Sequence, residues 1–233
     1  MSNRNGVIGW DAGGVNTYEA ARAATAGMPR DTGATAGIDT VETVVKLGGG
    51  VLAHAEHFDA ALAAIGAAAQ ERRLLVVPGG GPFANAVREV DRRLRLSDDA
   101  AHWMAVLAMD QYAHLVVARL AGGVLVAEPR EIAAALSAGP VGRVPVLAPY
   151  RWLREVDALP HAWMVTSDSI AAWVAGRVGA RRLVLVKPPG AAGSELVDAY
   201  FPRALPAHVT CVIVHADQGD ALRSALRAGV EHG

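Results

Sequence analysis

Short, nearly continuous apolar runs alternate with amphipathic helical patterns along most of this chain. Such runs are typical of parallel strands covered on both faces, because a strand buried on two sides loses its apolar–polar alternation. The pattern predicts strands at 43–49, 73–79, 123–128, 144–149, 162–167, 182–187 and 209–215. Between them it predicts helices at 57–71, 82–94, 98–120, 129–139, 168–180 and 217–229. We therefore expect an α/β fold, a three-layer αβα sandwich around a central, mostly parallel sheet.

Composition and charge narrow the class of protein. The 233 residues are 52% hydrophobic, which is enough for one large core. A net charge of -1 gives no long-range field that would attract nucleic acid or an anionic membrane. Every apolar run is broken before the roughly 18 residues needed to cross a bilayer. The one cysteine, Cys211, lies in the apolar run VTCVIV and is expected to be buried. We expect a cytoplasmic protein that binds neither nucleic acid nor membrane.

Two of the expected strands end in three consecutive glycines. The first reads VVKLGGG, with glycines at 48–50, and the second reads VVPGGGPFAN, with glycines at 79–81. Ligands of α/β proteins bind at the carboxyl ends of the strands, where both triplets fall. Glycine lets a ligand approach the backbone, and free N–H groups at a helix start attract anions. One triplet alone would be an ordinary connector, but two together predict a phosphate site.

Lys46 stands two residues before the first triplet. From the end of a strand its ammonium can reach over the turn to a phosphate held there. The alternative is a surface lysine that closes the strand. Neither triplet fits the G-x-x-x-x-G-K-[ST] or the G-x-G-x-x-G nucleotide fingerprint, so spacing alone does not identify the ligand.

Three motifs in sequence order resemble the amino acid kinase family. They are VVKLGGG, VVPGGGPFAN and VTSDSIAAWVA, and the resemblance covers about residues 41 to 230. The stretch NAVREVDRRLRLSDDAAHWMAVLAMDQYAHL is most similar to the branch that phosphorylates an (aminomethyl)furanylmethyl phosphate on the route to methanofuran, a C1 carrier. The resemblance implies a small-molecule kinase that uses ATP and Mg²⁺, accepts a phosphate monoester, and forms a homo-oligomer of two or more copies.

The resemblance also assigns roles to residues. Lys46, Asp168 and Lys187 would be catalytic, with Asp168 organising the two lysines. The transferred phosphate would be held by the backbone N–H groups of Gly48, Gly49 and Gly50. The hydroxyls of Thr166 and Ser167, and the ammonium group of Lys187, would also bind it. The acceptor would be held by Gly79, Gly80, Gly81, His102 and Asp110. No metal ligands are assigned.

Several of these residues have ordinary structural alternatives. His102 fits a partly buried core histidine as well as a contact to the acceptor's phosphate. Asp110, on the same expected helix, is a candidate for an ammonium group of the acceptor. The tryptophans at 103, 163 and 173 are expected in the core.

The stretch VKPPGAAG departs from the family pattern. Lys187 keeps the family's lysine, but Pro189 stands where uridylate kinases have an aspartate. Lys187 is alternatively an exposed lysine before a proline turn. Because this turn normally lines the nucleotide pocket, the departure favours a second hypothesis, a noncatalytic binding or storage protein, or an assembly subunit, on the same fold.

Residues 1–40 lie outside the kinase pattern, which we assign to a domain at 41–233. They are rich in Ala, Gly and Thr between 20 and 40. Such a segment fits a disordered extension, a mistaken start site, or an added strand or partner contact. We assign it no catalytic role.

Overall fold

The computed structural model describes residues 7–10, 16–19, 41–137, 142–193 and 196–228. Its eight strands form one sheet in the order β1-β2-β8-β7-β3-β4-β6-β5. The six strands from β8 to β5 are parallel to one another. They are β8 (Thr210–His215), β7 (Arg182–Lys187), β3 (Thr43–Leu47), β4 (Leu74–Pro78), β6 (Val144–Leu147) and β5 (Gly123–Val126).

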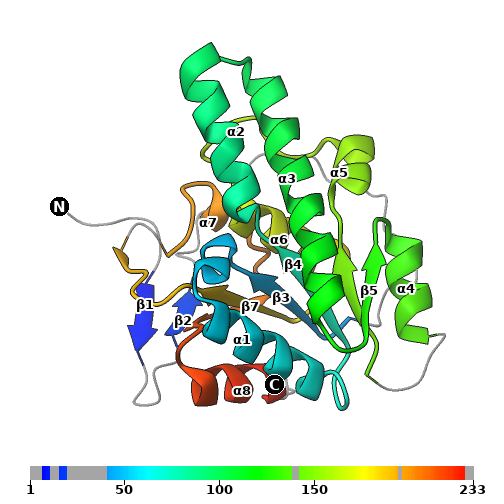
Figure 1. The fold of residues 1–233 in the computed structure, drawn as a ribbon. Helices are drawn as coiled ribbons and strands as arrows, with labels where there is room; N and C mark the ends of the chain where they lie inside the picture. Colours follow the sequence, from blue (N-terminus) through cyan, green and yellow to red (C-terminus); the bar gives the residue numbers. More distant parts are fainter. Residues whose placement is uncertain (1–6, 11–15, 20–40, 138–141, 194–195, 229–233) are drawn as a thin grey trace.

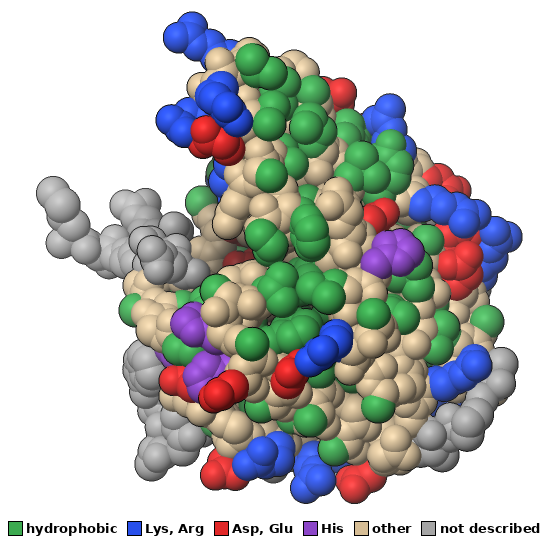
Figure 2. All heavy atoms as spheres, viewed as in Figure 1, with side chains coloured by type: hydrophobic (Ala, Val, Ile, Leu, Met, Phe, Trp, Pro, Cys, Tyr) green, Lys and Arg blue, Asp and Glu red, His purple; other side chains and the backbone are tan. Residues whose placement is uncertain are grey.

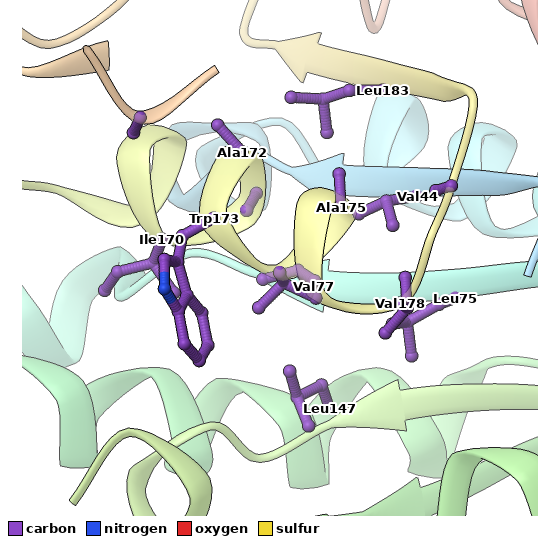
Figure 3. Close-up of a cluster of buried hydrophobic side chains, with 14 of the residues drawn as sticks. Val44, Leu75, Val77, Leu147, Ile170, Ala172, Trp173, Ala175, Val178 and Leu183 are labelled. Carbon is purple, nitrogen blue, oxygen red and sulfur yellow. The ribbon is translucent and has the colours of Figure 1, made fainter. Parts of the chain in front are cut away.

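Helices cover both faces of this sheet (Figure 1). α1 (Ala55–Ala68) and α8 (Gly219–Arg227) pack on one face, where they share a core with Val45 and Leu47 of β3. α6 (Ser167–Arg177) packs on the other face. Figure 3 shows Ala172 and Ala175 of α6 on the side of Leu183 and Val44 of the strands. The expected three-layer α/β sandwich is confirmed.

Two long helices, α2 (Gly81–Leu94) and α3 (Asp98–Arg119), pack along each other and project beyond the sheet (Figure 1). Ser97 caps α3, since its hydroxyl accepts a hydrogen bond from Ala100 N at 3.3 Å. Figure 2 shows cationic side chains gathered at the tip of this hairpin, where Arg92 and Arg93 pair with Glu89.

Most of the elements predicted from sequence are present within a few residues of their expected ends. These include α4 (Pro129–Ser137), whereas the short helices α5 (Tyr150–Val156), α7 (Phe201–Ala204) and η1 (Gly49–Ala53, a 3₁₀ helix) were not anticipated. The strand predicted at 162–167 was wrong. Val165 N donates to Ala162 O in a turn at 2.9 Å, and α6 begins at Ser167.

Two short strands lie within the first forty residues. β1 (Val7–Trp10) pairs with β2 (Asn16–Glu19) in an antiparallel ribbon, and β2 pairs antiparallel with β8. These two segments thus extend the sheet. Residues 1–6, 11–15 and 20–40 lie outside the described residues, so the division of the chain at residue 40 stays a prediction. None of the helices in the described part of the chain combines the length and the apolar character needed to span a bilayer.

Candidate active site

The two glycine turns lie in direct backbone contact. β3 and β4 pair in register, with Leu47 opposite Pro78, so the residues after them meet at the same edge of the sheet. A Cβ on Gly49 would lie 2.2 Å from the backbone nitrogen of Gly81, and one on Gly79 would lie 2.7 Å from that of Gly49. Real side chains do not tolerate such distances. The paired triplets are therefore required by the close approach of two backbones.

The N–H groups of these turns divide into two sets. Gly48 N donates to Val186 O, and Gly79 N donates to Leu47 O, each at 2.8 Å. These two donors tie neighbouring strands together, so the expectation that they hold phosphate needs correction. Gly49 and Gly50 open η1 and Gly81 opens α2, with Gly80 as its N-cap. The first N–H groups of a helix have no partner within it, and they remain the anion donors of this edge.

Strand alternation directs two lysines to the same place. Val44 and Leu185 face α6, and every second residue of a strand lies on the same face of the sheet. Lys46 and Lys187, two residues further along β3 and β7, therefore also face the start of α6. The two strands are neighbours in register, which sets the lysines side by side.

Asp168 joins these lysines. Its Oδ1 lies 2.7 Å from Lys46 Nζ, and its Oδ2 accepts a hydrogen bond from Lys187 Nζ at 2.6 Å. All three residues are at most 5% exposed. The alternatives that Lys46 and Lys187 are surface lysines are wrong, and the structure brings together the three residues predicted to be catalytic.

Burial and charge oppose each other in this trio. Burial would raise the pKa of Asp168, but the charges of Lys46 and Lys187, and their hydrogen bonds, hold that pKa below its ordinary value. Burial, together with the neighbouring Lys46, lowers the pKa of Lys187 to about 8. At neutral pH the trio carries one net positive charge in a site sheltered from water, which suits an anionic ligand.

A second carboxylate fixes the start of α6. Asp198 Oδ2 accepts hydrogen bonds from Thr166 Oγ1 at 2.7 Å and from the backbone nitrogens of Thr166 and Ser169 at 3.0 Å. Its Oδ1 accepts from Ser169 Oγ at 2.5 Å and from Phe201 N at 2.9 Å. Asp198 thereby orients Thr166, whose hydroxyl in turn accepts a hydrogen bond from Asp168 N at 3.4 Å.

Sequence reasoning missed Asp198. The KPPG turn lacks an aspartate at Pro189, and Asp198 brings a carboxylate to this region from further along the same connection. The available signal was an aspartate just before the Pro-containing start of α7, which is typical of a helix cap.

A cavity of about 570 Å³ opens beside the glycine turns. Its inner end is lined by Gly49, Gly50, Gly80, Gly81, Thr166 and Ser167. The lysine–aspartate trio is not part of this lining, but Thr166 and Ser167 directly precede Asp168. The cavity volume lies within the range of small-molecule sites.

His102 lines the middle of this cavity. Its ring stacks on that of His161 with centroids 4.3 Å apart and lies edge-on to Trp103. Burial, and secondly the charge of His161, lowers the pKa of His102 to about 4, so its imidazole is neutral at physiological pH. His161 is held by Asp157 at 2.7 Å and Asp99 at 3.0 Å. His102 thus offers an aromatic surface and neutral nitrogens rather than a cation.

Asp110 does not line the cavity. Its Oδ1 accepts a hydrogen bond from the backbone nitrogen of Tyr150 at 3.0 Å, at the first residue of α5, and burial raises its pKa to about 6. Met109 and Val106 are the neighbouring α3 residues that reach the cavity. The expected contact with an acceptor ammonium is therefore not supported by the position of Asp110.

Three cavity residues were missed or misplaced by sequence reasoning. Arg88 of α2, Asp98 of α3 and Trp163 line the outer end. Trp163 was expected in the core but is only half-buried, whereas Trp103 and Trp173 are buried as expected. The Trp163 indole donates to Asp91 Oδ2 at 2.7 Å, and the Arg88 guanidinium lies 5.1 Å from its ring centre. No motif marks these residues, because a turn and two helices bring them together.

The described residues offer no protein cage for a divalent cation. They contain no group of three or more His, Cys, Asp or Glu side chains placed to hold a metal ion. The buried carboxylate nearest the glycine turns, Asp168, is engaged by two lysines. A magnesium ion at this site would need ligands from a bound phosphate compound, which is how proteins often hold it.

The sequence model of the amino acid kinase family matches residues 42–188. The chain belongs to the amino acid kinase family. The match includes Lys46, both glycine turns, Asp168 and Lys187.

One curated relative and two solved structures extend this finding. A stretch of 146 residues is 29% identical to the [5-(aminomethyl)furan-3-yl]methyl phosphate kinase of Methanocaldococcus jannaschii, covering 61% of this chain and 63% of that protein. The chain thus spans less than two thirds of that relative. Uridylate kinase from Archaeoglobus fulgidus superimposes with a TM-score of 0.61 at 17% identity, over 82% of this chain and 97% of that one. UMP kinase from Ureaplasma parvum gives a TM-score of 0.63 at 14% identity, over 80% and 95%. At these identities the two structures establish the fold alone.

Proposed function

We propose that this protein transfers the γ-phosphoryl group of ATP to a phosphate monoester, forming a diphosphate and ADP. The observation that carries the proposal is the buried trio of Lys46, Asp168 and Lys187 beside two glycine turns that line an adjoining cavity. A cationic, preorganised site next to a ligand-sized cavity fits phosphoryl transfer, in which positioning and charge neutralisation supply most of the catalysis.

In the proposed reaction an acceptor oxygen bonds to the γ-phosphorus as the bond to the ADP oxygen breaks. Lys46 and Lys187 neutralise charge on the transferred group, and Asp168 holds both ammonium groups in place so that they need not reorganise during the reaction. Ser167 adds a hydroxyl donor, whereas the Thr166 hydroxyl already donates to Asp198 and therefore positions the start of α6 instead of binding the phosphate. Magnesium, when bound with ATP, supplies further neutralisation of the phosphates. No general base is required, because a phosphate monoester is already ionised at pH 7.

We further propose that the acceptor resembles an (aminomethyl)furanylmethyl phosphate and that the product enters a methanofuran-type C1 carrier. The name of the Methanocaldococcus jannaschii relative supports this substrate, as does a cavity with an aromatic wall at His102. We place the reaction in the cytoplasm and expect a homo-oligomer, since oligomers are common in this family.

The test is ADP formation with ATP and Mg²⁺ against a panel of phosphate monoesters and carboxylates that includes the aminomethylfuran phosphate. Lys46→Met serves as the blank. The proposal predicts that wild-type protein turns over at least one phosphate monoester and that Lys46→Met does not. If no compound is turned over and ATP does not raise the melting temperature, the protein with its KPPG turn does not bind ATP. The kinase function is then refuted in favour of a noncatalytic binding, storage or subunit function.

A further inference from the structure

The cavity has two ends of different charge. Its inner end is formed by the glycine turns, next to the lysine–aspartate trio. Its outer end lies along α2 and α3, where Arg88, Asp98 and Trp163 line it. Arg88 lies seven positions after Gly81 on α2, which corresponds to about 10 Å along a helix. A ligand whose phosphate sits at the inner end therefore presents its other end to these side chains.

Asp98 provides the only carboxylate in the lining, as far as the chain is described. Its side chain forms no hydrogen bond or ion pair with any described residue. The neighbouring acids are engaged, because Asp91 accepts hydrogen bonds from Trp163 and Leu96, and Asp99 accepts one from Trp103. Asp98, which is exposed at the outer end, is thus the acid of this region without a protein partner among the described residues.

The outer end also contains one cation, Arg88, but it forms no ion pair with Asp98 in the described part of the chain. Arg88 donates to the neutral Asn85 Oδ1 at 2.9 Å and lies over the ring of Trp163, so its guanidinium stays charged but is oriented by these two contacts. His102, between the two ends, carries no charge at neutral pH. The cavity therefore runs from a cationic inner end, through an aromatic middle, to an outer end with one uncommitted carboxylate.

We propose that Asp98 binds an ammonium group of the acceptor and makes the enzyme selective for phosphate monoesters that carry an amine at the opposite end of a small ring. This inference rests on the proposed function, because it takes the phosphate of the acceptor to lie at the glycine turns. It moves the ammonium contact from Asp110, which holds the backbone of α5, to a residue twelve positions earlier on the same helix.

The test compares two acceptors that differ in one group. One is the aminomethylfuran phosphate, and the other carries a hydroxymethyl arm in place of the aminomethyl arm. Calorimetric titration gives the Kd of each acceptor, and steady-state kinetics gives each kcat/KM. Wild-type protein is expected to prefer the amine by up to about tenfold in both quantities, because Asp98 attracts an ammonium group more strongly than a neutral hydroxyl and because solvent screens a pair at an exposed carboxylate. Asp98→Asn should bind and convert the two compounds nearly equally.

The matched control is Asp220→Asn. Like Asp98, Asp220 lies in the first turn of a helix, so both variants lose the same favourable interaction with a helix N-terminus, but Asp220 is on α8 and does not line the cavity. It should keep the wild-type preference for the amine. A preference that survives in Asp98→Asn, or its absence from wild-type protein, would overturn the inference.

Binding and turnover separate this inference from the proposed function. Amine-selective binding that depends on Asp98 but leads to no turnover would support the ammonium site and refute the kinase function. Turnover of both acceptors at equal kcat/KM would support the kinase function and refute the ammonium site. Failure of wild-type protein to bind either compound would refute both.

Discussion

At the scale of single residues, Asp168 is the centre of the site's electrostatics. It is buried between Lys46 and Lys187, and the three charges do not balance. A buried cation without a partner costs several kcal/mol, so Asp168 stabilises the fold by compensating two lysines at once. The remaining positive charge is the feature that an incoming phosphate would neutralise.

Asp168→Asn should therefore destabilise the protein as well as inactivate it. The substitution preserves shape but leaves two ammonium groups buried side by side without a countercharge. We expect the free energy of unfolding at pH 7 to fall by about 3–5 kcal/mol, measured by urea denaturation. Lys46→Met, which leaves a balanced Lys187–Asp168 pair, should lose less. Equal stability of Asp168→Asn and wild type would show that the trio does not hold these charges.

The pH dependence of turnover follows from Lys187. Burial lowers its pKa to about 8, so its ammonium group is present below that pH in the free protein and is lost as the pH rises through it. Because kcat/KM reports groups of the free enzyme, kcat/KM should decline above about pH 8. In Lys187→Arg the guanidinium stays charged over this pH range, so the decline in kcat/KM should disappear. Thermal melting checks that the variant is folded. A wild-type profile that stays level to pH 10 would contradict this assignment.

The sequence indicated the charged residues of the site but not their surroundings. Lys46, Asp168 and Lys187 stand in local motifs, at strand ends and a helix start, so their meeting place follows from the parallel sheet. Asp198, Arg88, Asp98 and Trp163 stand in no motif. Their positions depend on the path of a long connection and on how α2 packs against α3. The hydrophobic periodicity of the sequence predicts neither of these.

At the scale of elements, the contact between the two glycine turns positions β3, β4, η1 and α2 together. Gly48 and Gly79 each donate to a neighbouring strand residue, while a Cβ on Gly49 would strike the backbone of Gly81. The triplets therefore have two roles: one glycine of each is a structural tie, and the remaining glycines keep two helix starts close together.

Gly49→Ala should push these helix starts apart. Backbone cannot yield as a flexible side chain can, so we expect a lower melting temperature and a loss of most turnover. Gly66→Ala in α1 is the control, since its nearest neighbours would lie 3.7 Å away and alanine favours a helix by up to about 1 kcal/mol. Differential scanning fluorimetry and ADP formation measure both. Unchanged activity in Gly49→Ala would mean that the contact is not needed for the reaction.

The one strand predicted wrongly shows where periodicity misleads. The run AWMVTS has the composition of a strand, but its tryptophan bonds to Asp91 of α2 and its last residue already belongs to α6. Tertiary contacts decide such a short run. The longer helices were predicted within a few residues of their ends, whereas the short helices α5, α7 and η1 were not anticipated.

At the scale of the whole molecule, the sequence contains enough to place the six parallel strands and the helices that cover them, because each buried strand is a distinct apolar run. It does not contain the order of strands in the sheet, which puts β3 between β7 and β4. That order brings both lysines to the same side of α6 and both glycine turns to one edge. An added strand was one of three alternatives that the sequence left open for residues 1–40, because this segment lacks the long apolar runs that predict the other strands.

The measurement that tests the central claim most directly is ³¹P NMR of the protein with ATP, Mg²⁺ and the aminomethylfuran phosphate. The account predicts that the monoester resonance is replaced by the two coupled resonances of a diphosphate while ADP accumulates. Lys46→Met, folded by thermal melting, should slow this conversion by about a hundredfold or more, because it removes a charge used chiefly in the transition state. ATP consumed without a diphosphate resonance, or a Lys46→Met variant as fast as wild type, would contradict phosphoryl transfer at this site.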